Sequence, residues 1–155
     1  MNSIRSLMFA YVLATLALIT GPVTARAADL TPGQMEHLVR AVTAAQNRST
    51  APGVTVADVD RLFALYAPGF IYEHPGMDDV YTREQLYGNH VRAVRDGRFE
   101  RDASGPDNAD GYQIEALMYG TNAVAVQRRR RDVSRMAVFE FEDGKVSRIR
   151  EYWNY

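Results

Sequence analysis

The spacing of apolar residues changes once along this chain, at Gly97. Before Gly97, apolar residues recur about every 3.6 positions, which is the period of an amphipathic helix. After Gly97 they alternate with polar residues at a period of two, which is the pattern of strands that bury one face. Helices followed by a run of strands indicate an α+β domain rather than repeated βαβ units. The helices are then expected to cover the buried face of the sheet.

Apolar residues at helical spacing predict three helices before Gly97. They are expected over 35–46, from Thr55 or Asp58 to Pro68-Gly69, and from Thr82 to Gly97. Thr and Asp favour helix starts because their side chains accept hydrogen bonds from the first backbone amides. The apolar stretch 70–73 is expected to be a single strand that leads into a loop at Pro75-Gly76.

Four strands are expected after Gly97, because β-like runs there are separated by turn signals. The runs cover 112–119, 123–131, 135–142 and 146–153. Asp143-Gly144 is the strongest turn signal, since Asp-Gly favours a two-residue hairpin turn. The polar segment 98–110 has room for one more irregular strand.

Composition excludes several classes of protein. The chain has 155 residues, of which 46% are hydrophobic and 24% charged, and this suffices for one domain. It contains no cysteine, which excludes disulfide frameworks and thiolate metal sites. The net charge is -1, so no positive field attracts nucleic acid. His74, Asp78 and Asp79 lie on a Pro-Gly loop and are weak metal ligands as a group, so neither a metal nor a cofactor is expected.

The first residues have the layout of a secretory signal peptide. The apolar run 7–19 follows Arg5, and Ala25-Arg26-Ala27 supplies small residues at the positions that a signal peptidase reads. The run is shorter than the roughly 20 residues of a membrane-spanning helix. We therefore expect a signal peptide over 1–27, cleavage after Ala27, and a periplasmic or secreted domain over 28–155 that does not contact the membrane. An uncleaved membrane anchor is the alternative interpretation.

Two stretches resemble the nuclear transport factor 2-like superfamily, in its SnoaL-like, ketosteroid isomerase-related branch. They are LYAPGFIYEHP at 65–75 and FEFEDGKV at 139–146, the second being followed by REYW at 150–153. The resemblance implies a cone-shaped α+β domain in which a strongly curved antiparallel sheet wraps N-terminal helices around an apolar pocket. It also implies a homodimer formed through the outer sheet face. The superfamily hosts isomerases, cyclases, hydrolases, dehydratases and non-catalytic binders, so the fold does not assign an activity.

His74 is the most informative candidate for chemistry. In the isomerase branch an acidic general base precedes a proline, and the same context here reads Glu73-His74-Pro75. An imidazole has an unperturbed pKa near 6.5, so it can accept a proton at neutral pH. The alternative is a loop histidine that packs at the pocket mouth or caps a backbone carbonyl.

Glu151 is the candidate partner of His74. Strand alternation puts Ile149, Glu151 and Trp153 on one face, which lines the pocket by resemblance. Among apolar neighbours, desolvation would raise the pKa of the Glu151 carboxyl, and the two groups would form an acid/base pair. The alternative is a salt bridge from Glu151 to Arg135 or to another arginine on the adjacent strand.

The remaining candidates are side chains that could form the pocket wall or belong to the plain core. They are Tyr66, Tyr72, Tyr87, His90, Phe139, Ile149 and Trp153. The run Arg128–Arg131 is interpreted as a solvated strand end, because successive strand residues point to opposite faces and cannot form one basic patch.

Two functions remain open on the sequence. The first is a non-catalytic protein that binds a small apolar molecule, because the oxyanion-hole positions of the isomerases fall near His37 or Leu38 and at Ala137, which cannot donate a hydrogen bond. The alternative is an isomerase, cyclase or hydratase in which His74 is the general base on an apolar carbonyl-containing substrate.

Overall fold

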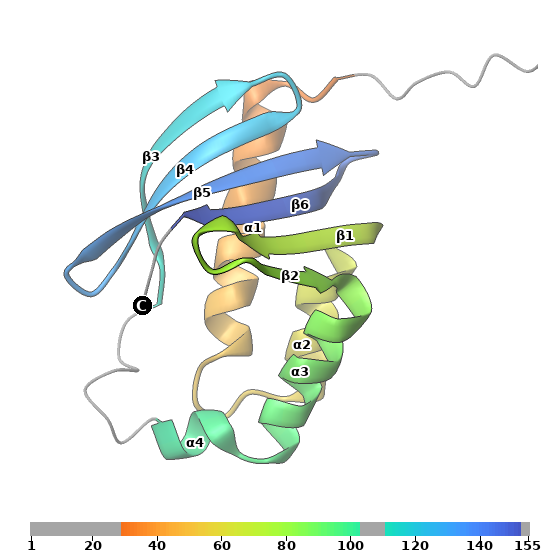
Figure 1. The fold of residues 1–155 in the computed structure, drawn as a ribbon, viewed down its shortest axis with the longest axis vertical. Helices are drawn as coiled ribbons and strands as arrows, with labels where there is room; N and C mark the ends of the chain where they lie inside the picture. Colours follow the sequence, from red (N-terminus) through yellow and green to blue (C-terminus); the bar gives the residue numbers. More distant parts are fainter. Residues whose placement is uncertain (1–28, 103–110, 153–155) are drawn as a thin grey trace, which may run out of the picture.

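Helices cover one side of a six-stranded sheet in the computed structural model, which describes residues 29–102 and 111–152 (Figure 1). The helices are α1 (Pro32–Ser49), α2 (Val56–Ala64), α3 (Arg83–Arg95), α4 (Arg98–Asp102) and the 3₁₀ turn η1 (Pro75–Met77). The strands are β1 (Tyr66–His74), β2 (Asp79–Thr82), β3 (Gln113–Gly120), β4 (Ala123–Arg130), β5 (Val133–Glu142) and β6 (Lys145–Tyr152). The prediction of an α+β domain, with helices first and a strand meander second, is confirmed.

Each of the three long helices begins with a threonine that caps it. Thr31, Thr55 and Thr82 accept a hydrogen bond from the backbone amide three residues later. The side chain of that third residue returns a hydrogen bond to the threonine backbone, which completes a capping box. The helix starts are therefore encoded within four residues of sequence. At the far end of α3, Gly97 has a positive φ of 61° and stops the helix as predicted.

The sheet is mixed, and the prediction of a wholly antiparallel sheet is wrong. Its strand order is β2-β1-β6-β5-β4-β3, and every neighbouring pair is antiparallel except β1 and β6, which run parallel. The register pairs Tyr72 with Ile149 and Glu73 with Arg150. A parallel neighbour must come from a distant part of the chain, so the local turn signals of the meander could not indicate it. The strong curvature implied by the resemblance stays a prediction.

Three boundaries differ from the sequence predictions. The second helix ends at Ala64, and β1 runs through Pro68-Gly69. The register of β1 against β6 shifts between Tyr66 and Ile71, and such an irregularity lets a proline sit inside a strand. The expected loop after Pro75 instead contains η1 and β2, which pairs with β1. The expected extra strand in 98–110 is replaced over 98–102 by the short helix α4.

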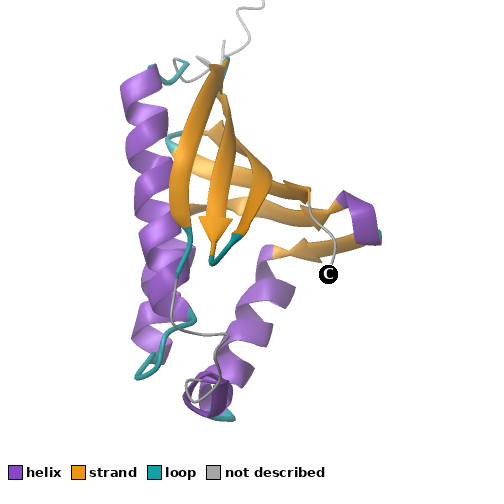
Figure 2. Cartoon of the chain, turned by 90° about the vertical axis from the view of Figure 1, so that its left-hand side faces the viewer, coloured by secondary structure: helices purple, strands orange, loops and turns teal. Residues whose placement is uncertain are grey.

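The apolar core lies between the helices and the inner face of the sheet. Met35, Val39 and Val42 on α1 are buried against sheet residues that include Val124, Val126, Phe139 and Ile149. Figure 2 shows the long helix α1 beside the strands along its upper turns and continuing past them, whereas α3 leaves the sheet at an angle. No helix in 29–102 or 111–152 has the length and apolar character that a membrane span requires. The predicted signal peptide lies outside the described residues.

Candidate active site

A cavity of about 230 Å³ lies between the helices and the sheet. Side chains from α1, α2, α3, β1, β4 and β6 line it, together with Tyr112 just before β3. The lining residues are Gln46, Ser49, Thr50, Leu62, Tyr66, Tyr72, His74, Leu86, His90, Tyr112, Arg130 and Glu151. The apolar pocket implied by the resemblance is therefore a cavity of mixed character, with carboxylate, imidazole, amide and hydroxyl groups among rings and leucines.

His74 and Glu151 meet in this cavity although 77 positions separate them in the sequence. Parallel pairing of β1 with β6 brings the end of β1 beside Glu151, because Glu73 is already in register with Arg150. His74 Nε2 lies 3.6 Å from Glu151 Oε2, and the two side chains are only 8% and 2% exposed. At this separation a protonated imidazole would form an ion pair with the carboxylate.

The second oxygen of Glu151 is held by Arg128. The Arg128 guanidinium forms a salt bridge with Glu151 Oε1, and both side chains are buried. Strand alternation explains the position, because Val124, Val126 and Arg128 lie on one face of β4 and all three are buried. The interpretation of Arg128 as part of a solvated strand end is therefore wrong. Glu151 does not lie among apolar neighbours alone, and the alternative interpretation of a salt bridge to an arginine is confirmed. The partner is Arg128 on β4, two strands away, and not Arg135 or another arginine on the adjacent strand.

Arg128 has further partners that hold it in place. Its Nη1 donates a hydrogen bond of 2.7 Å to Gln46 Oε1 on α1. Its guanidinium carbon lies 4.2 Å from the ring centroid of Tyr112 and 5.3 Å from that of Phe139. A buried cation needs such compensation, since it has lost its hydration shell. Glu151, which lines the cavity, is thus paired with a buried cation that several other groups hold in place.

Tyr72 connects the histidine to the carboxylate. Its hydroxyl lies 3.1 Å from His74 Nε2. Burial raises the pKa of Tyr72 well above its usual value, and the negative charge of Glu151 raises it further, as does a hydrogen bond to that carboxylate. The phenol therefore stays protonated. It can donate its proton toward Glu151 while its oxygen faces the His74 ring.

Tyr66 and His90 complete the aromatic part of the wall. Tyr66 stacks on Phe70 at 3.9 Å and accepts a hydrogen bond of 3.3 Å from Gln46 Nε2. Burial raises the pKa of its hydroxyl, so this group also stays neutral. The His90 ring lies with Nδ1 3.0 Å from the Leu86 carbonyl, and burial lowers the pKa of the imidazole.

Three of the other candidates, Tyr87, Phe139 and Ile149, are not among the residues that line this cavity. Tyr87 donates a hydrogen bond of 2.8 Å to Asp60 and packs edge-on against Phe63. Phe139 and Ile149 are fully buried core residues, and Phe139 touches the site only through Arg128. Trp153 lies outside the described residues. Among the residues that the structure describes, no group of three His, Cys, Asp or Glu side chains could hold a metal ion.

The sequence analysis missed Arg128, Gln46 and Tyr112. For Arg128 a usable signal existed, since the buried alternation of Val124 and Val126 continues to position 128. A carboxylate predicted to face inward also indicates a buried cation nearby, because an unpaired buried charge is costly. Gln46 lies near the C-terminal end of α1, and Tyr112 lies just before β3. No local sequence pattern indicates that either residue contacts Arg128.

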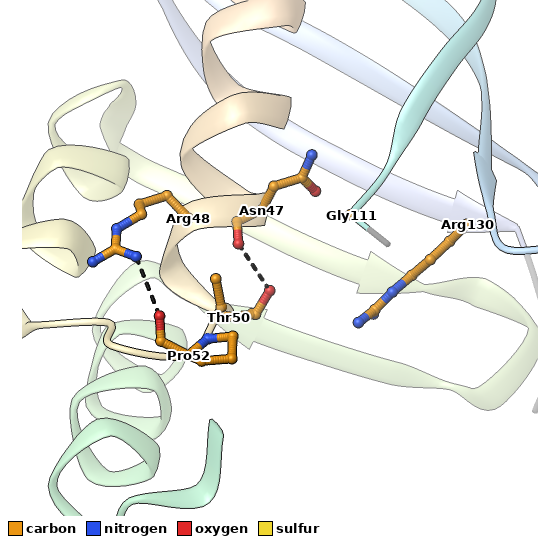
Figure 3. A pocket seen from close by; sticks show the side chains of 7 residues that line it. Asn47, Arg48, Thr50, Pro52, Gly111 and Arg130 are labelled. Atoms are coloured by element: carbon orange, nitrogen blue, oxygen red, sulfur yellow. Dashed lines mark hydrogen bonds between the residues drawn. The ribbon is translucent and has the colours of Figure 1, made fainter. Parts of the chain in front are cut away.

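A second pocket of about 360 Å³ adjoins the cavity, and Thr50 and Arg130 line both (Figure 3). Its wall is built from the end of α1 and the start of the β3 region. Asn47 Nδ2 donates a hydrogen bond of 2.9 Å to the Tyr112 carbonyl, and Asn47 Oδ1 accepts one of 2.7 Å from the Tyr112 amide. This pair of bonds fixes Tyr112 where its ring covers the Arg128 guanidinium.

Comparison with solved structures identifies the fold. A SnoaL-like protein of unknown function from Burkholderia thailandensis has a TM-score of 0.57 and 18% identity, over 81% of this chain and 99% of that one. An NTF2-like protein of unknown function from Burkholderia xenovorans has a TM-score of 0.52 and 15% identity, over 77% and 82%. An LEH-like epoxide hydrolase from M. tuberculosis has a TM-score of 0.53 and 17% identity, over 79% and 84%.

These likenesses are confined to the fold. No protein-family model matches the sequence, and no curated protein matches it. The identities are below those at which an activity can be carried from one protein to another. The resemblance to SnoaL-like and nuclear transport factor 2-like proteins is confirmed at the level of the fold, and the function must be argued from the cavity.

Proposed function

We propose that this domain of nuclear transport factor 2-like fold is an acid–base enzyme that uses His74 to accept a proton from a small organic substrate. One observation carries the proposal: His74 and Glu151 line the same cavity, 3.6 Å apart, and Arg128 binds the far oxygen of Glu151. The three groups come from β1, β6 and β4, so only the folded sheet assembles them.

The charges support a base role for His74. Contact with Arg128 favours the ionised form of Glu151, and a carboxylate 3.6 Å away stabilises the imidazolium that forms when His74 takes a proton. Glu151 therefore acts as the electrostatic partner of the base and not as a second proton donor. These roles differ from those of an acid/base pair in which both His74 and Glu151 exchange protons with the substrate, because Arg128 opposes protonation of the Glu151 carboxylate.

The size and lining of the cavity support a small substrate. Pockets for drug-sized ligands span roughly 300–1,000 Å³, whereas this cavity is about 230 Å³. It accommodates a small carbonyl compound, or the reactive end of a longer molecule that continues into the adjoining pocket. Tyr66 and Tyr72 carry neutral hydroxyls in the wall, and such groups can donate to an oxygen on which charge develops.

The test is proton exchange in heavy water. Purified protein is incubated with small ketones with and without a hydroxyl group, such as hydroxyacetone, cyclohexanone and 2-cyclohexen-1-one, and loss of the α-proton signal is followed by NMR. We expect exchange above the buffer rate, and a fall of about 100-fold or more in His74→Gln. His37→Gln changes an exposed histidine on α1 and is the matched control. Equal exchange by the wild type and by a folded His74→Gln protein contradicts the proposal.

A non-catalytic binder is the second candidate, and the buried Arg128–Glu151 pair is the observation that favours it. A carboxylate already neutralised by a cation serves equally well as a fixed feature of a binding cavity. A ligand retained through native purification, bound equally by His74→Ala and Glu151→Ala proteins that exchange no α-protons, would support it. Export with cleavage after Ala27 remains a proposal from the sequence alone.

A further inference from the structure

His90 has a fixed orientation in the cavity wall. Its Nδ1 lies 3.0 Å from the backbone carbonyl of Leu86, one turn earlier on α3. A carbonyl oxygen only accepts hydrogen bonds, so Nδ1 must carry the proton in this contact. In the neutral ring the other nitrogen, Nε2, then has a lone pair and accepts.

Burial lowers the pKa of the His90 imidazole and so favours the neutral ring, and this effect outweighs the opposite effect of the hydrogen bond to Leu86. The ring also packs edge-on against Phe63, with the centroids 5.8 Å apart. Within residues 29–102 and 111–152, the Leu86 carbonyl is the only hydrogen-bond partner found for the ring. An acceptor nitrogen in a cavity wall is therefore available to whatever enters the cavity.

The two histidines of the cavity differ in their partners. His74 lies beside Tyr72 and Glu151, which are groups suited to proton transfer. Among the described residues His90 bonds only to its own helix, and no carboxylate or guanidinium is found in contact with it. This arrangement suits recognition more than chemistry, because a neutral, largely buried acceptor discriminates between donor-bearing molecules and those without a donor.

We propose that His90 Nε2 accepts a hydrogen bond from a hydroxyl or N–H group of the substrate. The inference rests on the proposed function in one respect, namely that the cavity is the substrate site. It narrows the substrate class to small molecules that carry a donor group in addition to the reacting carbon. A ligand that presents only a carbonyl or ether oxygen to His90 would place an oxygen lone pair against the lone pair of Nε2, and this repulsion would weaken its binding.

The probes are phenol and methoxybenzene, which share a ring and differ in the donor. Binding is measured by NMR titration of wild-type protein and of the His90→Leu and His90→Gln variants. We expect the wild type to bind phenol about tenfold tighter than methoxybenzene, which corresponds to one hydrogen bond. His90→Leu should lose this preference, and His90→Gln should retain part of it because its amide oxygen also accepts.

Tyr87→Phe is the matched control, because Tyr87 lies on the same helix and its hydroxyl bonds to Asp60 and not into the cavity. It should leave the preference unchanged. A direct readout is the ¹⁵N signal of His90 Nε2, which should move toward that of a hydrogen-bonded acceptor with phenol and not with methoxybenzene. Equal affinity of the wild type for both probes, or a preference that persists in His90→Leu, overturns the inference.

The assay separates this inference from the proposed function. Probe binding requires no turnover, so His74→Gln should keep the preference for phenol while losing α-proton exchange. Preserved preference with no exchange in the wild type would remove the enzyme proposal and leave the recognition role of His90. Exchange by the wild type with no preference between the probes would support the enzyme proposal and remove the recognition role of His90.

Discussion

Arg128 on β4 and Glu151 on β6 form an ion pair across the intervening strand β5, and each side chain is only 2% exposed. Burying two charges is costly, and their mutual attraction offsets that cost only with good geometry and further hydrogen bonds. Gln46 and the Tyr112 ring supply those contacts to Arg128. The pair thus joins α1 to β4 and β6, beside His74, which lines the same cavity as Glu151.

Removing one member of this pair should be strongly destabilising. We expect Arg128→Met or Glu151→Gln to lower the free energy of unfolding by about 3–5 kcal/mol, because the remaining polar group loses its partner in a buried site. The double variant Arg128→Met, Glu151→Met should be more stable than Arg128→Met alone. Urea unfolding measures all of these, and Arg40→Ala, which breaks an exposed pair with Glu36, is the control. Equal losses at Arg40 and Arg128 would contradict the burial argument.

The Tyr72 hydroxyl should make the protein sensitive to alkali. Its pKa is raised in the folded protein, whereas in the unfolded chain it ionises near pH 10. The stabilisation from the neutral phenol is therefore complete below pH 10 and is lost as pH rises above it. The unfolding free energy of Tyr72→Phe should fall less steeply between pH 9.5 and about pH 11. Identical slopes for both proteins would count against a buried phenol.

His90 should produce a loss of stability in mild acid. Burial lowers its pKa, so below about pH 6.5 the unfolded chain binds a proton that the folded protein does not. Stability is present above that pH and declines as pH falls, by up to about 1.4 kcal/mol per pH unit. His90→Gln should flatten this decline in urea unfolding at pH 7.5 and 5.5, with His37→Gln as the comparison. An unchanged decline would show that His90 does not cause it.

Gly111 is required for the contact between Asn47 and Tyr112. A Cβ at Gly111 would overlap the Asn47 side chain, whose amide holds both backbone groups of Tyr112. Gly111→Ala should lower the unfolding free energy by about 1–3 kcal/mol, as overpacking does. Gly33→Ala has open space around the new methyl group inside α1 and should raise stability by about 0.4–1 kcal/mol. Equal effects at the two glycines would contradict this account.

The outer sheet face should mediate the homodimer that the resemblance implies. Met118, Met136 and Tyr152 are 74%, 44% and 50% exposed, and the strand registers put them on the same face, opposite Glu151 and Ala137. Exposed apolar side chains gathered on one face favour association. We expect light scattering to report a dimer that Met118→Glu with Met136→Glu converts to a monomer. Ala44→Glu at an exposed position on α1 is the control, and a monomeric wild type would end the proposal.

Prediction of the candidate site from the sequence succeeded and failed for identifiable reasons. Alternation along the last strand correctly put Ile149 and Glu151 on one inward face. The same rule applied to 123–131 predicts that Arg128 faces inward with Val124 and Val126, and the structure confirms this against the interpretation of the four arginines as a solvated strand end. Periodicity predicts the face of the strand on which a residue lies, but it does not predict whether a group of opposite charge lies near it in the folded protein.

Local interactions between residues close in the sequence determine the helices and the strand meander, so the sequence alone predicts them. Thr31, Thr55 and Thr82 close their capping boxes within three residues, and Asp143-Gly144 makes its turn with positive φ at both positions. The geometry of the candidate site has another origin. His74 reaches Glu151 because β1 pairs in parallel with the last strand, and Arg128 reaches Glu151 across β5. Such contacts depend on the packing of the whole chain, since their energies arise only after distant segments have lost water and come together.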